Sequence, residues 1–166
     1  MTTLMSVFQK PFTVTQGGAD TAAESTLATN IQPGITYGAW ELEAVEFTLK
    51  PDLVKTWTGV DMDLTLQITK RSLAASIVRL VSYADTDLVT SISIAGIATG
   101  TAANFLIQPA TFFVNFPPGI IVYSDSIYVQ LISAATGATN VCWGRILYQL
   151  ITLSQSQAFA VVASRP

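Results

Sequence analysis

The stretch Asp61-Met-Asp-Leu-Thr-Leu-Gln-Ile-Thr69 alternates polar and apolar residues without a break. Its apolar residues, which run at alternate positions from Met62 to Ile68, would point to one side of an extended chain, and its polar residues to the other. A period of two is typical of a β-strand that packs one face on a core. The stretch therefore predicts a sheet with an apolar side and a polar side.

A longer stretch, Gly38-Ala-Trp-Glu-Leu-Glu-Ala-Val-Glu-Phe-Thr-Leu49, shows the same alternation with one slip in phase. Trp40 and Leu42 carry the apolar face before the slip at Ala44-Val45, and Val45, Phe47 and Leu49 carry it afterwards. One extra residue in a strand produces such a slip, and this is the definition of a β-bulge. We expect a long strand with a bulge at this point.

Short strand-like runs separated by Gly, Pro and Asn occupy most of the rest of the chain. They are Leu88–Ile97, Ala110–Phe116, Ile120–Tyr123, Ser126–Ser133 and Val141–Leu153. Pro117-Pro118-Gly119 reads as a turn between two of them, and the last two runs read as a hairpin. Leu73–Val81 fits either a helix or a strand, and its β-rich flanks favour a strand, whereas residues 52–59 suggest a short helical turn. Eight or nine short strands with at most two brief helices predict an all-β antiparallel sandwich or barrel.

The two ends of the chain lack this periodic pattern. In residues 1–35 only Pro11–Thr15 looks strand-like, and residues 154–166 hold only a short apolar run, Ala158–Val162. We therefore expect an N-terminal arm or extended loop over 1–35, a β-domain over 36–153 and a C-terminal tail over 154–166. Both ends are expected to lie outside the main sandwich, along neighbouring subunits or along the inner surface of an assembly of subunits.

The composition is unusual because half of the residues are hydrophobic and only 11% are charged. About a quarter of the residues in an ordinary soluble domain are charged. Much of the surface must then consist of uncharged side chains, and large weakly charged surfaces mark contact with other protein. The composition indicates a subunit that is surrounded mainly by copies of itself or by related proteins.

Several functions are disfavoured by the residues that the chain lacks. The net charge is −3, and the eight basic residues are scattered apart from Lys70-Arg71, which reads as a solvated turn. Nucleic-acid binding needs clustered bases, so we expect no direct contact with DNA or RNA. The chain has no histidine, and its one cysteine, Cys142, lies in an apolar stretch and is expected to be a buried structural thiol. The N-terminus shows no secretory signal, which favours folding in a cytoplasm.

Three weak candidate sites remain, and each has a simpler structural explanation. Asp61-x-Asp63 and Asp85-x-Asp87, with Asp125, could supply oxygen ligands to a hard cation, but they also suit an acidic strand entry and an acidic turn. Paired carboxylates of a glycosidase could come from Glu41, Glu43, Glu46 and Asp125, although nothing in their spacing favours this. The aromatic residues could line a sugar-binding face but are more often core or interface residues. These aromatics are Trp40, Trp57, Trp143, Tyr37, Tyr83, Tyr123, Tyr128 and Tyr148. We expect no catalytic residue, no cofactor, no small-molecule substrate and no metal site, and hence no enzyme.

In its order of strands the chain resembles the single jelly-roll coat proteins of small icosahedral viruses. The likeness rests on the N-terminal segment rich in Thr, Ala and Gly, the bulged strand Gly38–Leu49 and the terminal runs Ser126-Ile-Tyr-Val-Gln-Leu-Ile-Ser133 and Val141-Cys-Trp-Gly-Arg-Ile-Leu-Tyr-Gln-Leu150. It covers most of the chain but contains no short diagnostic motif. Many coats that package RNA carry a basic N-terminal arm. In this chain the first 35 residues contain one basic residue, Lys10. This is more similar to the small coat proteins of tailless icosahedral phages, some of which enclose a membrane.

The resemblance implies an eight-stranded jelly roll and a structural capsid protein that self-assembles into an icosahedral shell. Its partners would be copies of itself and other capsid proteins, with an internal membrane or another protein beneath the shell, and it would be located in a virion assembled in the host cytoplasm. The alternative is a trimeric receptor-binding or carbohydrate-binding jelly roll of the spike or lectin-like type. A cupin is excluded, because cupins bind metal through histidine.

Overall fold

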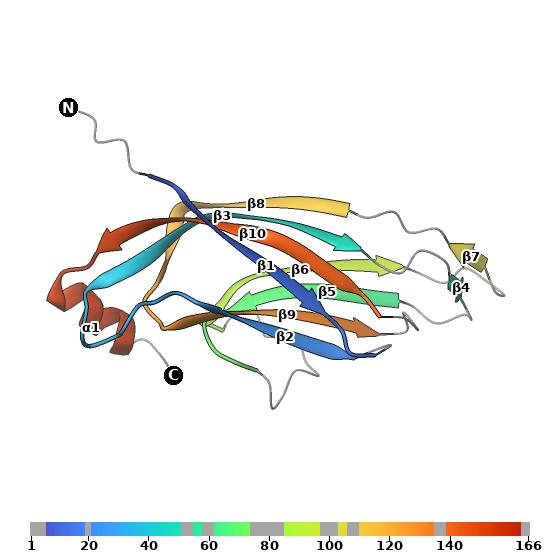
Figure 1. Cartoon of the computed structure of the whole chain (residues 1–166), viewed down its shortest axis with the longest axis horizontal. Coiled ribbons are helices and arrows are strands. Elements are labelled where there is room, and N and C mark those ends of the chain that lie inside the picture. The colour runs from blue at the N-terminus through green and yellow to red at the C-terminus, as the bar shows by residue number, and fades with distance from the viewer. Residues whose placement is uncertain are drawn as a thin grey trace.

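A computed structural model describes residues 6–18, 21–50, 55–57, 62–73, 85–96, 103–105, 110–134 and 139–163. Two four-stranded antiparallel sheets face each other, with one helix at one end of the sandwich (Figure 1). The strands are β1 (Phe8–Thr15), β2 (Ala22–Ala28), β3 (Gly38–Lys50), β4 (Lys55–Trp57), β5 (Met62–Thr69), β6 (Leu88–Gly96), β7 (Ala103–Phe105), β8 (Ala110–Val122), β9 (Ser126–Ala134) and β10 (Val141–Thr152). The helix is α1 (Gln155–Ala163).

The strand order defines the topology as a jelly roll. One sheet has the order β1-β10-β3-β8, the other β2-β9-β5-β6, and the short strands β4 and β7 form a separate pair at the end opposite α1. Among the eight long strands, the first pairs with the last, the second with the seventh, the third with the sixth and the fourth with the fifth. This is one long antiparallel hairpin rolled into two sheets, which is the eight-stranded jelly roll expected from the sequence.

The predicted bulge in β3 is confirmed. The register of β3 shifts between Leu42 and Ala44 against both neighbouring strands. Against β10, Glu43 is the extra residue, because Leu42 and Ala44 pair with the adjacent residues Tyr148 and Leu147. Against β8, the longer insertion is on β8, where residues 116–119 lie opposite Glu43. Trp40 and Leu42 are buried on one side of the bulge, and Val45 and Phe47 on the other. The extra residue lets one strand keep its apolar side on the core although the alternation of its sequence changes phase. The side chain of Leu49 lies outside the described part.

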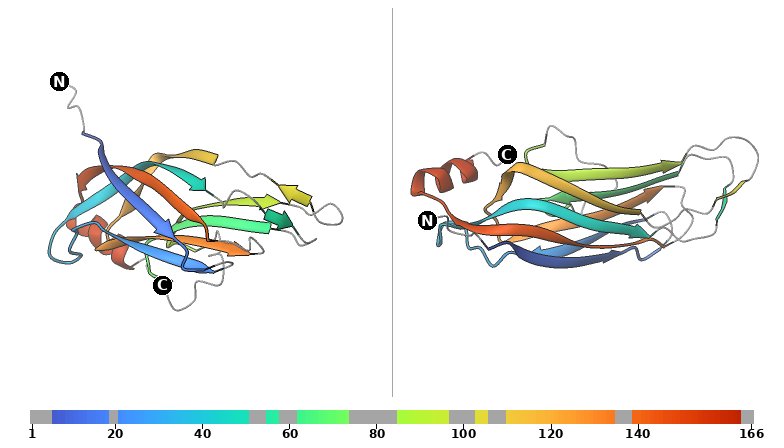
Figure 2. Two further views of the ribbon diagram at one scale, coloured as in Figure 1. Left: turned by 45° about the vertical axis from the view of Figure 1, so that its right-hand side comes forward. Right: turned by 90° about the horizontal axis from the view of Figure 1, so that it is seen from above.

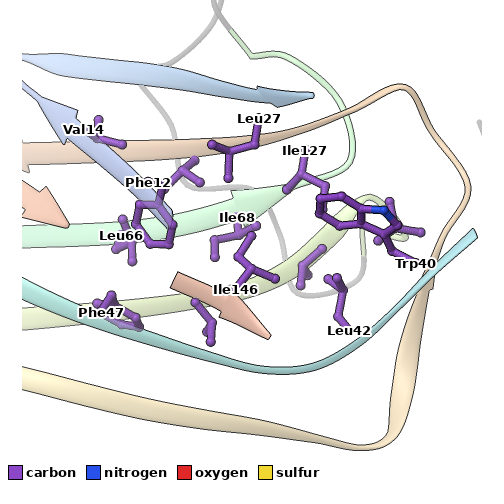
Figure 3. Packing of buried hydrophobic residues seen from close by; sticks show 14 of the residues in the cluster. Phe12, Val14, Leu27, Trp40, Leu42, Phe47, Leu66, Ile68, Ile127 and Ile146 are labelled. Atoms are coloured by element: carbon purple, nitrogen blue, oxygen red, sulfur yellow. The ribbon is translucent and has the colours of Figure 1, made fainter. Parts of the chain in front are cut away.

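The core lies between the sheets, and apolar side chains from both of them fill it (Figure 3). In the sheet that contains β1, the side chain of Tyr148 stacks on Trp40, with ring centroids 3.7 Å apart, and on Phe8, at 5.7 Å. Phe47 stacks on Phe112 at 5.3 Å. Facing them from the other sheet are Leu64, Leu66, Ile68, Ile127, Val129 and Leu131, each at most 1% exposed.

The N-terminal segment is part of the sandwich, which corrects our expectation of an arm outside it. β1 pairs with β10 along its whole length, and β2 pairs with β9. Phe12 and Val14 of β1 and Leu27 of β2 are at most 6% exposed. Both strands lie at the edges of their sheets, where a strand needs few large apolar residues and tolerates a proline such as Pro11. For this reason the segment carries only a faint periodic signal.

The C-terminal segment also packs against the sandwich. Ser154 and Gln157 form a capping box at the start of α1, because the backbone N–H of Ser154 donates to Gln157 Oε1 (2.8 Å) and that of Gln157 to Ser154 Oγ (3.3 Å). Ala158 is only 5% exposed and belongs to the core cluster. Our expectation that residues from 154 onward would lie outside the sandwich is wrong for α1.

Two expectations about connections are also corrected. β9 and β10 do not form a hairpin but belong to different sheets, so the chain crosses from one sheet to the other between them (Figure 2). The runs on either side of Pro117-Pro118 belong to one strand, β8, because both pair with β3. At the edge of a sheet, a missing proline N–H can face away from the neighbouring strand. Residues 74–81 and most of 52–59 lie outside the described part, although Lys55–Trp57 form a strand and not a helical turn.

The polar side of β5 is buried, although alternation alone suggested a solvated face. Thr65, Gln67 and Thr69 are each at most 1% exposed. Thr69 Oγ1 accepts a hydrogen bond from Gln130 Nε2 (2.8 Å), and the same nitrogen donates to Glu24 Oε2 (2.9 Å). After β5 the chain turns across this sheet toward β2, where the backbone N–H of Leu73 donates to Glu24 Oε2 (2.9 Å). On this side of the sheet, Glu24, Thr69 and Gln130 are therefore held by one another.

Candidate functional site

The acidic turn Asp85-x-Asp87 is neutralised within the chain. The guanidinium of Arg71 contacts Asp85 Oδ2 at 2.6 Å and Asp87 Oδ2 at 3.1 Å. The backbone N–H of Asp87 donates to Asp85 Oδ1 (2.9 Å), and this bond, helped by Arg71, lowers the pKa of Asp85 from its ordinary value. Lys70 Nζ donates to the carbonyl of Thr86 (3.0 Å). The basic pair Lys70-Arg71, at the end of β5, therefore contacts the acidic turn that precedes β6.

The remaining acidic candidates are dispersed. Glu46 pairs with Arg145, Glu43 accepts a hydrogen bond from Gln149 (2.9 Å), and the exposed Asp125 supplies a backbone carbonyl to Thr29 (2.9 Å). Asp61 and the side chain of Asp63 lie outside the described residues. Within the described ranges, no three His, Cys, Asp or Glu side chains are grouped closely enough to hold a metal ion.

The aromatic candidates are divided between core and surface. Trp40 and Tyr123 are at most 2% exposed, and Tyr148 is stacked on Trp40. By contrast, Trp143 is 41% exposed on β10, and Tyr37 is 45% exposed in the loop before β3. Tyr128 is half-buried, while Tyr83 and the side chain of Trp57 lie outside the described part. The aromatic residues that the structure describes therefore do not share one sugar-binding face.

Cys142 is completely buried in β10, as expected, and burial raises the pKa of its thiol to about 12. We expect no detectable reaction of the folded protein with a thiol reagent such as DTNB at pH 8, and full reaction once urea has unfolded it. An unfolded thiol ionises near pH 8.5, so the folded state should also lose stability as the pH rises from about 9 toward 12. Rapid labelling of the folded protein would contradict this assignment.

The most distinctive surface is the side of sheet β1-β10-β3-β8 that faces away from the core, which we call the outer face. Sequence reasoning had not located it. It consists of Pro11, Thr13, Glu46, Thr48, Thr111, Phe113, Asn115, Trp143, Arg145 and Leu147. These residues alternate along their strands with buried ones, so their side chains point outward. The register of the three strand pairs aligns them in rows across the sheet.

Two of these rows contain the aromatic and charged residues of the outer face. In one row, Trp143 lies between Thr13 and Thr48. In the next, Arg145 and Glu46 are neighbours, and Phe113 follows at 56% exposure.

The charges of Arg145 and Glu46 compensate each other. Arg145 Nε donates to Glu46 Oε2 at 2.7 Å, and its Nη2 lies 2.6 Å from the same oxygen. Arg145 Nη1 donates to Gln9 on β1 (3.0 Å). The guanidinium thereby links β1, β10 and β3. Phe113 lies in the same row, and Trp143 lies in the next row on the same side of the sheet. The result is a nearly neutral surface with two large aromatic groups, and aromatic residues with Arg are enriched at the centres of protein interfaces.

Comparisons with known proteins support the fold. No protein-family model matches the chain, and no curated protein matches it in sequence. Among solved structures, it is similar to VP1 of Trichodysplasia spinulosa-associated polyomavirus, with a TM-score of 0.51 and 9% identity over 93% of this chain and 98% of that chain. A structure of the human polyomavirus 6 VP1 pentamer has a TM-score of 0.48 and 9% identity, covering 92% of this chain and 97% of that one. The first likeness shows that the chain shares the jelly-roll fold of a viral capsid protein, as the resemblance implied.

Proposed function

We propose that this chain is a structural coat protein whose copies associate into an icosahedral virus shell. The observation that carries the proposal is the outer face, which exposes Trp143 and Phe113 around a compensated ion pair. A nearly neutral sheet surface costs little free energy to desolvate on contact with protein, and each Å² of apolar area that Trp143 and Phe113 bury contributes about 25 cal/mol. Many symmetric contacts of this kind close a shell although each is weak.

Similarity of fold to a viral VP1 agrees with this proposal. The low charge of the whole chain supports it as well, because a shell subunit contacts neighbours on several sides. In this role the chain acts by burial and needs no catalytic group. Its partners are copies of itself and other capsid proteins, and its location is the virion, assembled in the host cytoplasm.

The same proposal includes a negative element, namely that the subunit does not hold the genome directly. Of the basic residues that the structure describes, Arg71 and Arg145 are engaged in ion pairs. Binding to phosphates requires several clustered bases with free charge. A membrane, another protein or small cations would then lie between the shell and the genome. Within the described residues, no helix has the length and hydropathy needed to cross a bilayer.

A carbohydrate-binding or receptor-binding role is the second candidate, and the exposed Trp143, whose strand neighbours are Thr13 and Thr48, is the observation that favours it. An aromatic ring beside hydroxyl groups can stack on a sugar. A compact trimer that binds glycans and loses this binding in Trp143→Ala would support this candidate instead of the coat protein.

The coat-protein proposal is tested by assembly of the purified full-length protein, followed by light scattering and electron microscopy. We expect particles whose yield falls at least about tenfold, equivalent to 1.4 kcal/mol, in Trp143→Asp and in Phe113→Asp. Trp143→Phe is the matched control, because it keeps an aromatic apolar group, and it should retain assembly. Particles should persist at high salt, since apolar contacts are not screened. A chain that stays monomeric at high concentration, even with companion coat proteins supplied, would show the proposal to be wrong.

A further inference from the structure

The end of the sandwich that carries α1 has an apolar groove between the helix and the loop that precedes β3. Its walls are formed by Pro33, Gly34, Tyr37, Tyr123, Ala158, Phe159 and Val162, and its volume is about 210 Å³. Among the residues that the structure describes, no charged side chain lines this groove. The helix lies at the opposite end of the molecule from β4 and β7 (Figures 1 and 2).

Hydrogen bonds from Tyr123 and from the backbone just before α1 fix the loop that forms one wall of the groove. The buried hydroxyl of Tyr123 donates to the carbonyl of Thr36 (2.6 Å) and accepts from the backbone N–H of Gly34 (3.0 Å). The backbone N–H of Leu153, just before α1, donates to the carbonyl of Tyr37 (2.8 Å). Loop and helix are thus fixed to each other, and a partner would find the groove already formed.

The helix exposes apolar groups on the side that faces away from the core. Ala158 is buried and Val161 packs against the core, while Phe159 is 66% and Val162 44% exposed. No acidic residue lies in its first turn and no basic residue in its last. A helix that is apolar on both sides is typical of a fully buried position, so the outward side of α1 lacks its cover in a single copy.

The size and chemistry of the groove restrict what can cover it. Pockets for small molecules usually have 300–1,000 Å³ and a few converging polar groups, so this groove is too small and too apolar for such a ligand. A charged partner would find no counter-charge among the lining residues. The groove instead suits one or two apolar side chains that project from an uncharged protein surface.

The chain itself presents such a projection next to the groove. Ile35 lies in the same loop and is 78% exposed. A projection and a hollow on one patch are the requirement for an isologous contact, in which each of two copies gives and receives the same group. Ile35, Tyr37, Phe159 and Val162 together offer roughly 500 Å² per copy, so that two copies would bury about 1,000 Å², near the lower limit for a specific interface.

We propose that a second copy of this chain docks on the α1 end through a two-fold contact, with Ile35 of each copy inserted in the groove of the other. This inference rests on the proposed function, because it names one contact that such a shell would use. The contact is separate from the outer face, so a subunit would have two independent contact surfaces.

The test is sedimentation equilibrium of the full-length Trp143→Asp variant, in which larger particles are suppressed. We expect this variant to be a dimer. Ile35→Asp and Val162→Asp, each added to Trp143→Asp, should raise the dimer dissociation constant at least about tenfold. Thr26→Asp, which adds the same charge at an exposed position of β2, should leave it unchanged. Circular dichroism and the urea midpoint should match those of the parent protein, since both substituted side chains are substantially exposed.

Two results would overturn the inference: a protein that remains monomeric at the highest attainable concentration, or a dimer as tight in Ile35→Asp as in the parent. A third contradicting result could come from flotation with phosphatidylcholine vesicles. If the protein formed no dimer but bound the vesicles, and Ile35→Asp abolished this binding, the partner of the groove would be lipid. Normal particles from Ile35→Asp alone would refute this contact but leave the coat-protein proposal intact. Dimers without particles under any condition would refute the coat-protein proposal and retain the contact.

Discussion

Gly144→Ala should lower the free energy of unfolding by about 3 kcal/mol, because β10 has no room for a side chain at this position. A Cβ atom added there would lie 2.7 Å from Cβ of Phe47 and 2.8 Å from Cζ of Phe12, and closer still to the carbonyl oxygen of Glu46. The register places Gly144 between Phe12 on β1 and Phe47 on β3. Since one of the obstructing atoms belongs to the backbone of β3, rotation of a side chain cannot relieve the clash.

The matched control is Gly38→Ala, at the start of β3. No atom lies within 4 Å of an added Cβ at Gly38. The substitution should therefore be neutral or stabilise the fold by up to about 1 kcal/mol, through the reduced entropy of the unfolded chain. Urea unfolding followed by tryptophan fluorescence measures both variants. Equal stability of the two would show that the sheet around Gly144 relaxes more easily than its geometry indicates.

Replacing Gln16 with alanine should also cost about 3 kcal/mol, since several buried polar groups would lose their partner. Gln16 is 1% exposed and joins the two sheets where β1 ends. Its Nε2 donates to the Thr21 carbonyl and to Ser133 Oγ (2.8 Å). Its Oε1 accepts from the backbone N–H (3.1 Å) and from Nδ2 (2.6 Å) of Asn140. The substitution would leave these groups buried and would open a cavity.

Gln9→Ala is the control, with the same change on the same stretch of chain. Gln9 is exposed, and its side chain accepts a hydrogen bond from Arg145 (3.0 Å). Its loss should change stability by no more than about 0.5 kcal/mol. If Gln16→Ala unfolded at the same urea concentration as Gln9→Ala, the buried network would have no net stabilising role. Hydrogen exchange of the Asn140 amide gives a second readout, because its protection should fall in Gln16→Ala alone.

Strong local patterns led to correct predictions for the inner strands. The alternation from Met62 to Ile68 identified β5, and the slip at Ala44-Val45 located the bulge in β3 to within one residue. Both strands lie inside their sheets, where one side must pack on the core along the whole length. Such strands need a regular apolar period, so the period is visible in the sequence.

The edge strands and the connections could not be found in this way. β1 and β2 pair on one side only, and a few residues such as Phe12, Val14 and Leu27 suffice to fasten them. Likewise, β9 and β10 have the pattern of a hairpin, but their partners are strands far away in the chain, β5 and β3 among them. Alternation gives the face that a strand buries and contains no information about which strand it pairs with.

The sequence predicted the chemical character of the candidate assembly surface but did not predict which residues form it. The low charge indicated broad contact with other protein, and the absence of histidine and of clustered bases argued against metal chemistry and nucleic-acid binding. The sequence did not distinguish Trp143, which is exposed, from Trp40, which is buried in a similar alternating strand. The difference arises from the opposite directions in which their side chains leave the same sheet.

The sequence by itself determined the all-β class, the bulge and the weakly charged surface, because period and composition are local or additive properties of a chain. Only the tertiary structure decided that Arg145 meets Glu46, that Phe113 lies in the same row, and that Ile35 stands beside a groove made with α1. The residues in each of these sets are far apart in sequence. They become neighbours because the rolled hairpin pairs its first strand with its last, and so brings both ends of the chain to one sheet.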